Sequence, residues 1–145
     1  MNSEWSIVNS DWESEAPGFD EGEVIQDYRD LRVWSASVDL AIDIFTTTRR
    51  FPAEEKFGAV TQMRRSANSI PANIAEGFGR EQTGSFIQFL RIAQGSLKEL
   101  ETHIIIATRV DMLPLSDSER LMAQTTTVGK MLRSYIRALA ARKDH

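Results

Sequence analysis

The sequence predicts an all-α protein: an antiparallel up-and-down four-helix bundle that follows a disordered, acidic N-terminal arm. Apolar residues recur at three- and four-residue steps in four segments, which is the spacing of one helix face. The links between these segments are short, so consecutive helices are expected to run antiparallel. No segment alternates apolar and polar residues as a half-buried strand does. A chain of 145 residues suits a single core.

Residues 1–28 are expected to form the arm and residues 29–145 the bundle. Residues 1–30 carry nine acidic residues and one arginine, whereas residues 31–145 carry twelve acidic and sixteen basic residues. An acidic arm therefore precedes a mildly basic body. The arm is rich in Ser, Asp and Glu, which favours disorder. It also contains Trp5, Trp12 and Phe19, so two interpretations stay open: a solvating arm, or a segment that docks on a partner or on the basic body.

The first helix is expected to begin after Asp30, a suitable N-cap, and to fade at Thr46–Thr48. Its apolar stripe comprises Leu31, Trp34, Val38, Ala41, Ile42 and Phe45.

The second helix is expected to open at Phe51–Pro52, because proline is tolerated in a first helical turn. Gly77 and Gly79 are expected to close it. Its stripe comprises Phe57, Val60, Met63, Ala67, Ile70 and Ile74.

The third helix is expected from about Thr83 to Met112. Besides one apolar stripe, it carries Ile87, Ile105, Ile106 and Val110 outside that stripe. An apolar arc this wide exceeds what one core-facing stripe requires, so we expect another subunit to cover the excess.

The fourth helix is expected to start at a capping box, with Ser116 as the N-cap and Glu119 three residues later. It continues to about Leu139. Lys130, Arg133 and Arg137 share a face away from its apolar stripe, at i, i+3 and i+7.

Pro71 falls inside the second helix, where its ring removes one backbone hydrogen bond. The helix can kink there, or stop and restart with Ser69 near an N-cap position. Asn73 and Glu76 lie three residues apart on one face, and buried polar groups there would need partners. A structural network and a polar ligand pocket at the kink both remain open. The candidate network comprises Arg65, Ser69, Asn73, Glu76, Ser96 and Glu99.

The sequence offers no catalytic, cofactor-binding or metal-binding motif. The glycine spacing of 79–84 resembles a phosphate-binding loop, but the required lysine is missing and no strand precedes it. The two histidines, His103 and His145, lack the Glu-x-x-His spacing of a di-iron bundle. We therefore expect no cofactor, no metal and no enzymatic activity.

Composition and the N-terminus point to a cytoplasmic protein. There is no cysteine, which fits a reducing compartment. The first residues lack the basic and apolar regions of a signal peptide, and the longest apolar run is far too short to span a membrane.

Basic side chains form the candidate nucleic-acid-binding set. Arginine suits bidentate contact with phosphate, and repeated patches in an oligomer would add multivalency. Solvated arginines on helix faces are the competing interpretation. We expect Arg64, Arg65, Arg80 and Arg91 to cluster near the junction of the second and third helices. The full set comprises Arg64, Arg65, Arg80, Arg91, Lys130, Arg133, Arg137, Arg142 and Lys143.

Two motifs carry a resemblance to a known family: SIPANIAEG at 69–77 and AQGSLKEL at 93–100. Together with DLRVWSASVDLAIDIF at 30–45, they resemble the four helix bundle proteins. That family includes proteins encoded within intervening sequences of bacterial 23S ribosomal RNA genes. The resemblance covers about residues 31–139 and implies a four-helix subunit that assembles into a ring, a pentamer. It also implies kinship with accessory proteins of diversity-generating retroelements, which bind nucleic acid and a reverse transcriptase. It supplies no catalytic residues.

The leading hypothesis is thus a non-enzymatic, homo-oligomeric bundle that binds RNA or DNA or scaffolds a nucleoprotein. One alternative is a protein-interaction scaffold whose acidic arm recruits a partner. Another is a small-ligand binder at the Pro71 kink that uses Asn73, Glu76 and Glu99.

Overall fold

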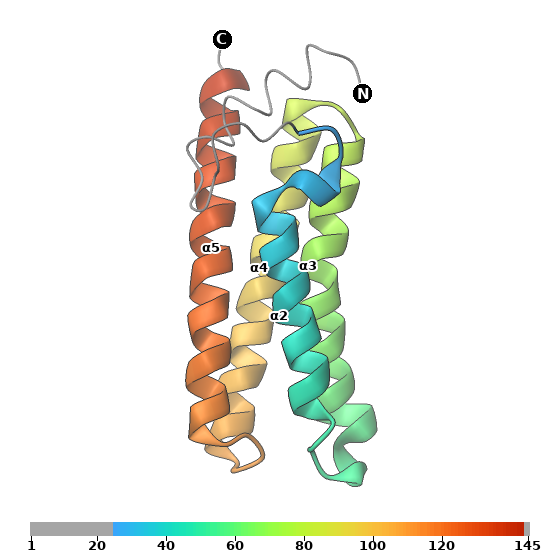
Figure 1. Cartoon of the computed structure of the whole chain (residues 1–145), viewed down its shortest axis with the longest axis vertical. Helices are drawn as coiled ribbons and strands as arrows, with labels where there is room; N and C mark the ends of the chain where they lie inside the picture. The colour runs from blue at the N-terminus through green and yellow to red at the C-terminus, as the bar shows by residue number, and fades with distance from the viewer. Residues whose placement is uncertain (1–24, 144–145) are drawn as a thin grey trace.

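The structure is a computed structural model, and it describes residues 25–143. Helix α2 spans Arg32–Thr48, α3 spans Thr61–Gly79, α4 spans Thr83–Arg109 and α5 spans Leu115–Lys143. Successive helices run in opposite directions along one long axis, and the described residues include no strand (Figure 1). The predicted all-α, antiparallel four-helix bundle is confirmed.

The four helices surround one core. The neighbouring pairs are α2–α3, α3–α4, α4–α5 and α2–α5, so the α2–α3 side lies opposite the α4–α5 side. Each helix contributes apolar side chains; Leu40, Ile74, Leu97 and Leu132 are 0–1% exposed. Removing one such side chain typically costs about 2–5 kcal/mol, so these side chains supply most of the bundle's cohesion.

The face of α2 that enters the core differs from the expected stripe. Val33, Leu40 and Ile44 are buried, whereas Ile42 is 58% exposed. Trp34, Val38 and Phe45 are half-buried.

The folded body begins earlier than the expected boundary at residue 29. Ile25 is fully buried in the core, and Tyr28 packs edge-on against Trp34 with ring centroids 5.3 Å apart. A short 3-10 turn, Tyr28–Asp30, connects this segment to α2. Residues 25–28 thus belong to the body, whereas the rest of the predicted arm, 1–24, lies outside the described residues.

The N-terminus of α2 is capped from another helix. Asp30, the expected N-cap, instead accepts hydrogen bonds from the backbone of Gln26 and Asp27 and so closes the 3-10 turn. Leu31 takes the N-cap position, and its apolar side chain cannot accept a hydrogen bond. The backbone N–H of Val33 donates to the buried Tyr135 hydroxyl on α5, 3.3 Å away.

The link between α2 and α3 is helical but irregular. A 3-10 turn, Ala53–Glu55, follows Pro52, and a π-helical turn, Lys56–Val60, precedes α3. A π turn holds more residues than an α turn, so it rotates the helix face. For this reason Phe57, expected in the core stripe, is 87% exposed.

Helix α3 passes through Pro71 without interruption, so of the two alternatives left open by the sequence, the stop and restart does not occur. Asn73 Nδ2 donates to the Ser69 carbonyl oxygen at 2.7 Å and lies 3.0 Å from Ser69 Oγ. Ser69 Oγ in turn shares a 2.7 Å hydrogen bond with Ser96 Oγ of α4. Side-chain bonds around the proline therefore also join α3 to α4.

Gly77 does not close α3, contrary to expectation. It is buried inside the helix, where an added Cβ would lie 2.6 Å from the Cβ of Phe89 on α4. The helix ends at Gly79, and Glu81 takes the left-handed conformation that follows, with φ 56°. Gly77 is thus a close-contact residue between two helices.

The apolar arc of α4 is narrower than the sequence suggests, because Ile87 is only 8% exposed and belongs to the core. Ile105, Ile106 and Val110 are exposed as expected, at 41%, 51% and 57%, and Ile92 joins them at 45%. A smaller apolar surface therefore remains on α4.

An ion-pair network, absent from the sequence predictions, joins α2 to α5. Arg120 Nε and Nη2 each donate to Asp43 at 2.9 Å, and Nη1 donates to Asp117. Gln124 also donates to Asp43, at 2.6 Å, and Arg50 pairs with Asp117 at 3.0 Å. The hydrogen bonds from Arg120 hold the pKa of the Asp43 carboxyl below its usual value.

Helix α5 begins at Leu115, so Ser116 is its second residue and not the predicted N-cap. Asp117 supplies the acidic group of the first turn, where a negative charge is favoured by the helix dipole.

Candidate nucleic-acid interface

Arg64 is occupied inside the subunit. Its Nε donates to Thr48 Oγ1 at 3.0 Å, and Nη2 donates to the Phe45 carbonyl at 3.3 Å. Its guanidinium also lies 4.6 Å from the centre of the Phe45 ring. Arg64 thus ties α3 to the C-terminal end of α2, and this role competes with phosphate contact.

The expected cluster of arginines at the α3–α4 junction is not present. Arg65 and Arg80 are separated by about 22 Å along α3, at 1.5 Å per residue. Arg80 pairs with Glu76 at 3.2 Å and lies 5.3 Å from the centre of the Phe89 ring. The arginines of α3 therefore form no single patch.

Arg91 lies instead with the basic residues of α5. Gly129 of α5 faces the Leu97 side chain of α4, and Thr125 Oγ1 donates to Glu101 Oε2 at 2.9 Å. This antiparallel register brings Arg91, six residues before Leu97, to about the same level as Arg133, four residues after Gly129.

Lys98 extends this group and was missed by the sequence reasoning. It follows Arg91 by seven residues, about two helical turns, so the two share a face. Its side chain is 69% exposed, and its Nζ donates to Glu101 at 2.9 Å. Extending the i, i+7 spacing from Arg91 would have found it.

The structure thus presents one surface with several exposed cations, the α4–α5 basic face. Each of its members is exposed to solvent. It comprises Arg91, Lys98, Lys130, Arg133 and Arg137. Of the two remaining predicted residues, Arg142 is half-buried near the end of α5, and Lys143 is the last residue of that helix.

The predicted polar network forms only in part. Ser69, Asn73 and Ser96 are joined as described above, whereas the Glu76 side chain is 54% exposed and pairs with Arg80. The Glu99 side chain is also 54% exposed and lies 3.5 Å from His103. Arg65 is exposed on α3. The carboxylates face solvent because the α3–α4 seam buries small side chains at its centre and leaves longer ones at its edge.

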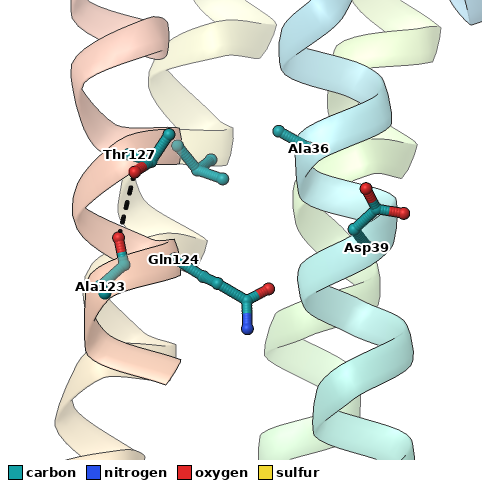
Figure 2. A pocket seen from close by; sticks show the side chains of 6 residues that line it. Ala36, Asp39, Ala123, Gln124 and Thr127 are labelled. Carbon is teal, nitrogen blue, oxygen red and sulfur yellow. Dashed lines mark hydrogen bonds between the residues drawn. The ribbon is translucent and has the colours of Figure 1, made fainter. Parts of the chain in front are cut away.

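A groove of about 310 Å³ lies between α2 and α5, lined by Ala36, Asp39, Ala123, Gln124, Thr127 and Val128. Figure 2 shows Gln124 reaching from α5 toward α2 and the Thr127 hydroxyl bonded to its own helix. That hydroxyl donates to the Ala123 carbonyl at 3.2 Å, while the Gln124 amide donates to Asp43. These polar groups are therefore engaged within the protein.

Residues 25–143 contain neither a cluster of metal ligands nor a helix suited to cross a membrane. No group of three or more His, Cys, Asp or Glu side chains there could hold a metal ion. None of the helices in that range combines the length and the hydropathy that crossing a membrane requires.

Comparison with known proteins agrees with this architecture. The family model described as 23S rRNA-intervening sequence protein matches residues 29–134, which include all of α2, α3 and α4. A solved structure is also similar: a protein of unknown function from the S23 ribosomal protein family of Bacteroides thetaiotaomicron. It shares 28% sequence identity at a TM-score of 0.68, covering 72% of this chain and 95% of its own. No curated protein matches the sequence. The chain therefore belongs to the family of 23S rRNA-intervening sequence proteins.

Proposed function

We propose that this protein is a non-enzymatic, self-associating bundle of the cytoplasm that binds RNA or DNA through its α4–α5 basic face. The observation that carries the proposal is the gathering of five exposed cations from two helices on one surface. Lys and Arg that contact phosphates release condensed counterions, which favours binding irrespective of nucleotide sequence. Family membership supports a role connected with ribosomal RNA genes.

Self-association is supported by one face of α4. Ile92, Gly95, Ile106 and Val110 fall on the same side of the helix by their spacing, and all four are exposed. An ideal Cβ on Gly95 would meet nothing within 4 Å. A glycine in a helix interior costs about 0.5–1 kcal/mol relative to alanine. A second helix packed closely against this face would explain both the exposed isoleucines and the glycine.

Self-association through the apolar face of α4 would also favour nucleic-acid binding, because α4 contributes to the α4–α5 basic face as well. An assembly built through the apolar face of α4 would repeat the basic face once per subunit. Repeated weak phosphate contacts on one nucleic acid then act together and raise the apparent affinity. The family resemblance suggests a pentameric ring.

Filter binding of an RNA and a DNA of equal length, at several salt concentrations, tests the proposal. We expect affinity to fall as salt rises, and the double variant Arg133→Gln/Arg137→Gln to bind more weakly. The slope of log affinity against log salt concentration should be smaller by about two, one for each lost phosphate contact. The double variant Lys56→Gln/Arg65→Gln removes the same charge from exposed positions in and before α3 and should bind as the unmodified chain does. Absence of binding at low salt would refute the proposal.

A further inference from the structure

We propose that the N-terminal segment of this chain, residues 1–24, docks within the same chain in an apolar groove between α2 and α3. The groove measures about 460 Å³ and lies beside Pro71. It is lined by Val38, Ala41, Ile42, Phe45, Thr46, Arg49, Asn68 and Pro71.

The groove leaves apolar surface in contact with water. Ile42 is 58% exposed, and the side chains of Val38 and Phe45 are only half-buried. Covering such side chains is favourable in proportion to the apolar area that is removed from water. The groove therefore suits a ligand that carries large apolar groups.

The N-terminal segment supplies such groups together with the matching charge. Residues 1–24 contain Trp5, Trp12 and Phe19, interleaved with seven acidic residues and no basic residue. The lining of the groove includes the exposed Arg49 and no carboxylate. The groove on the other side of α2 is lined by Asp39 and so would repel an acidic segment. Charge thus favours the α2–α3 groove over the groove between α2 and α5.

The attachment point allows docking within one chain. Ile25 is anchored in the core shortly before α2 begins at Arg32, and Ile42 lies about 15 Å further along that helix. The thirteen residues from Trp12 to Ile25 can span up to about 45 Å when extended. A short tether also gives an effective concentration on the order of millimolar, so even weak contacts would be occupied.

Docking there leaves the proposed nucleic-acid surface open. The α2–α3 side of the bundle lies opposite the α4–α5 side. The acidic segment would therefore be held away from the α4–α5 basic face, and both surfaces could be occupied together.

Tryptophan fluorescence of the full chain, measured without nucleic acid, tests this inference. In a Trp34→Phe background only Trp5 and Trp12 emit. We expect acrylamide to quench them at least about twofold less strongly than it quenches a synthetic peptide of residues 1–24. In the full chain, Ile42→Glu should raise the quenching to the level measured for the peptide. Leu115→Glu introduces the same change at another exposed apolar position, 66% exposed at the start of α5, and should have no effect.

Quenching in the full chain equal to that of the peptide would overturn the inference, and so would equal protection in the Ile42→Glu variant. Protection that rises with protein concentration, or that is lost in a chain whose self-association is blocked by Ile106→Asp, would place another copy's segment in the groove and exclude docking within one chain. Because no nucleic acid is present, these outcomes are independent of the nucleic-acid proposal.

Discussion

Two glycines on neighbouring helices occupy opposite environments. Gly77 of α3 lies against α4, where a methyl group would come within 2.6 Å of Phe89 Cβ and 3.1 Å of the Phe86 ring. Gly95 of α4 is exposed, and a methyl group added there would contact no other part of the subunit within 4 Å. The first glycine allows two helices of one chain to approach closely, and the second leaves room for a helix from outside.

Alanine substitutions at these two positions should have opposite effects on stability. Gly77→Ala is expected to lower the free energy of unfolding by about 1–3 kcal/mol, because neither Phe89 Cβ nor the backbone can move away cheaply. Gly95→Ala should raise the stability of the isolated subunit by about 0.5–1 kcal/mol, since alanine restricts the unfolded chain. Urea denaturation of both variants in an Ile106→Asp background, in which self-association is blocked, measures the difference. A stabilising Gly77→Ala would contradict the close contact of α3 and α4.

At the scale of elements, the pairs α3–α4 and α2–α5 are joined by different chemistry. Small residues join α3 to α4. Gly77 allows close contact at one level, and Ser69, Asn73 and Ser96 form hydrogen bonds at another. Charged groups join α2 to α5 through Asp43 and Arg120. The Arg120 side chain is 44% exposed, so solvent weakens its contribution relative to a buried pair.

The Asp43–Arg120 pair should make stability depend on pH. The folded protein depresses the pKa of Asp43, so its contribution is present above the unfolded value near 3.9 and is lost as pH falls through the folded value. Asp43→Asn is expected to cost about 1–2 kcal/mol at pH 7, after allowance for exposure. This difference should shrink below about pH 4. Denaturation curves at pH 7 and pH 3 check it, with Asp39→Asn, exposed on the same helix, as the control. A cost independent of pH would exclude the ionic explanation.

At the scale of the whole molecule, three surfaces lie on different sides of the bundle. The apolar face of α4 points away from the core, the α4–α5 basic face adjoins it, and the α2–α3 groove lies on the opposite side. This separation permits self-association, phosphate contact and docking of the N-terminal segment at the same time.

Self-association through α4 predicts a specific response to charge. Ile106→Asp should shift the protein toward the monomer, because assembly would bury an unpaired carboxylate at the interface. Leu115→Asp should leave the assembly unchanged, since Leu115 lies outside that face. Sedimentation velocity at several protein concentrations measures both. A monomeric unmodified chain would refute the assembly.

The sequence by itself determined the elements of this fold and most of its core. Apolar spacing located all four helices, and the short links predicted their antiparallel order, because periodicity and chain connectivity are local properties. The same reasoning identified the bond donors and acceptors beside Pro71 and the basic stripe of α5. It misplaced Phe57, since an irregular π turn changes helix phase without a clear compositional signal. It also chose the wrong face of α2, where Val33, Leu40 and Ile44 are buried in place of Val38, Ile42 and Phe45.

Only the tertiary structure decided which distant residues meet. Arg64 binds the end of α2 and so leaves the predicted basic cluster, whereas Arg91 and Lys98 join the cations of α5. The Asp43–Arg120 pair and the Tyr135 bond to Val33 join residues 77 and 102 positions apart. Such contacts depend on how helices rotate and slide against one another, and this is set by core packing and not by the local spacing of any one segment.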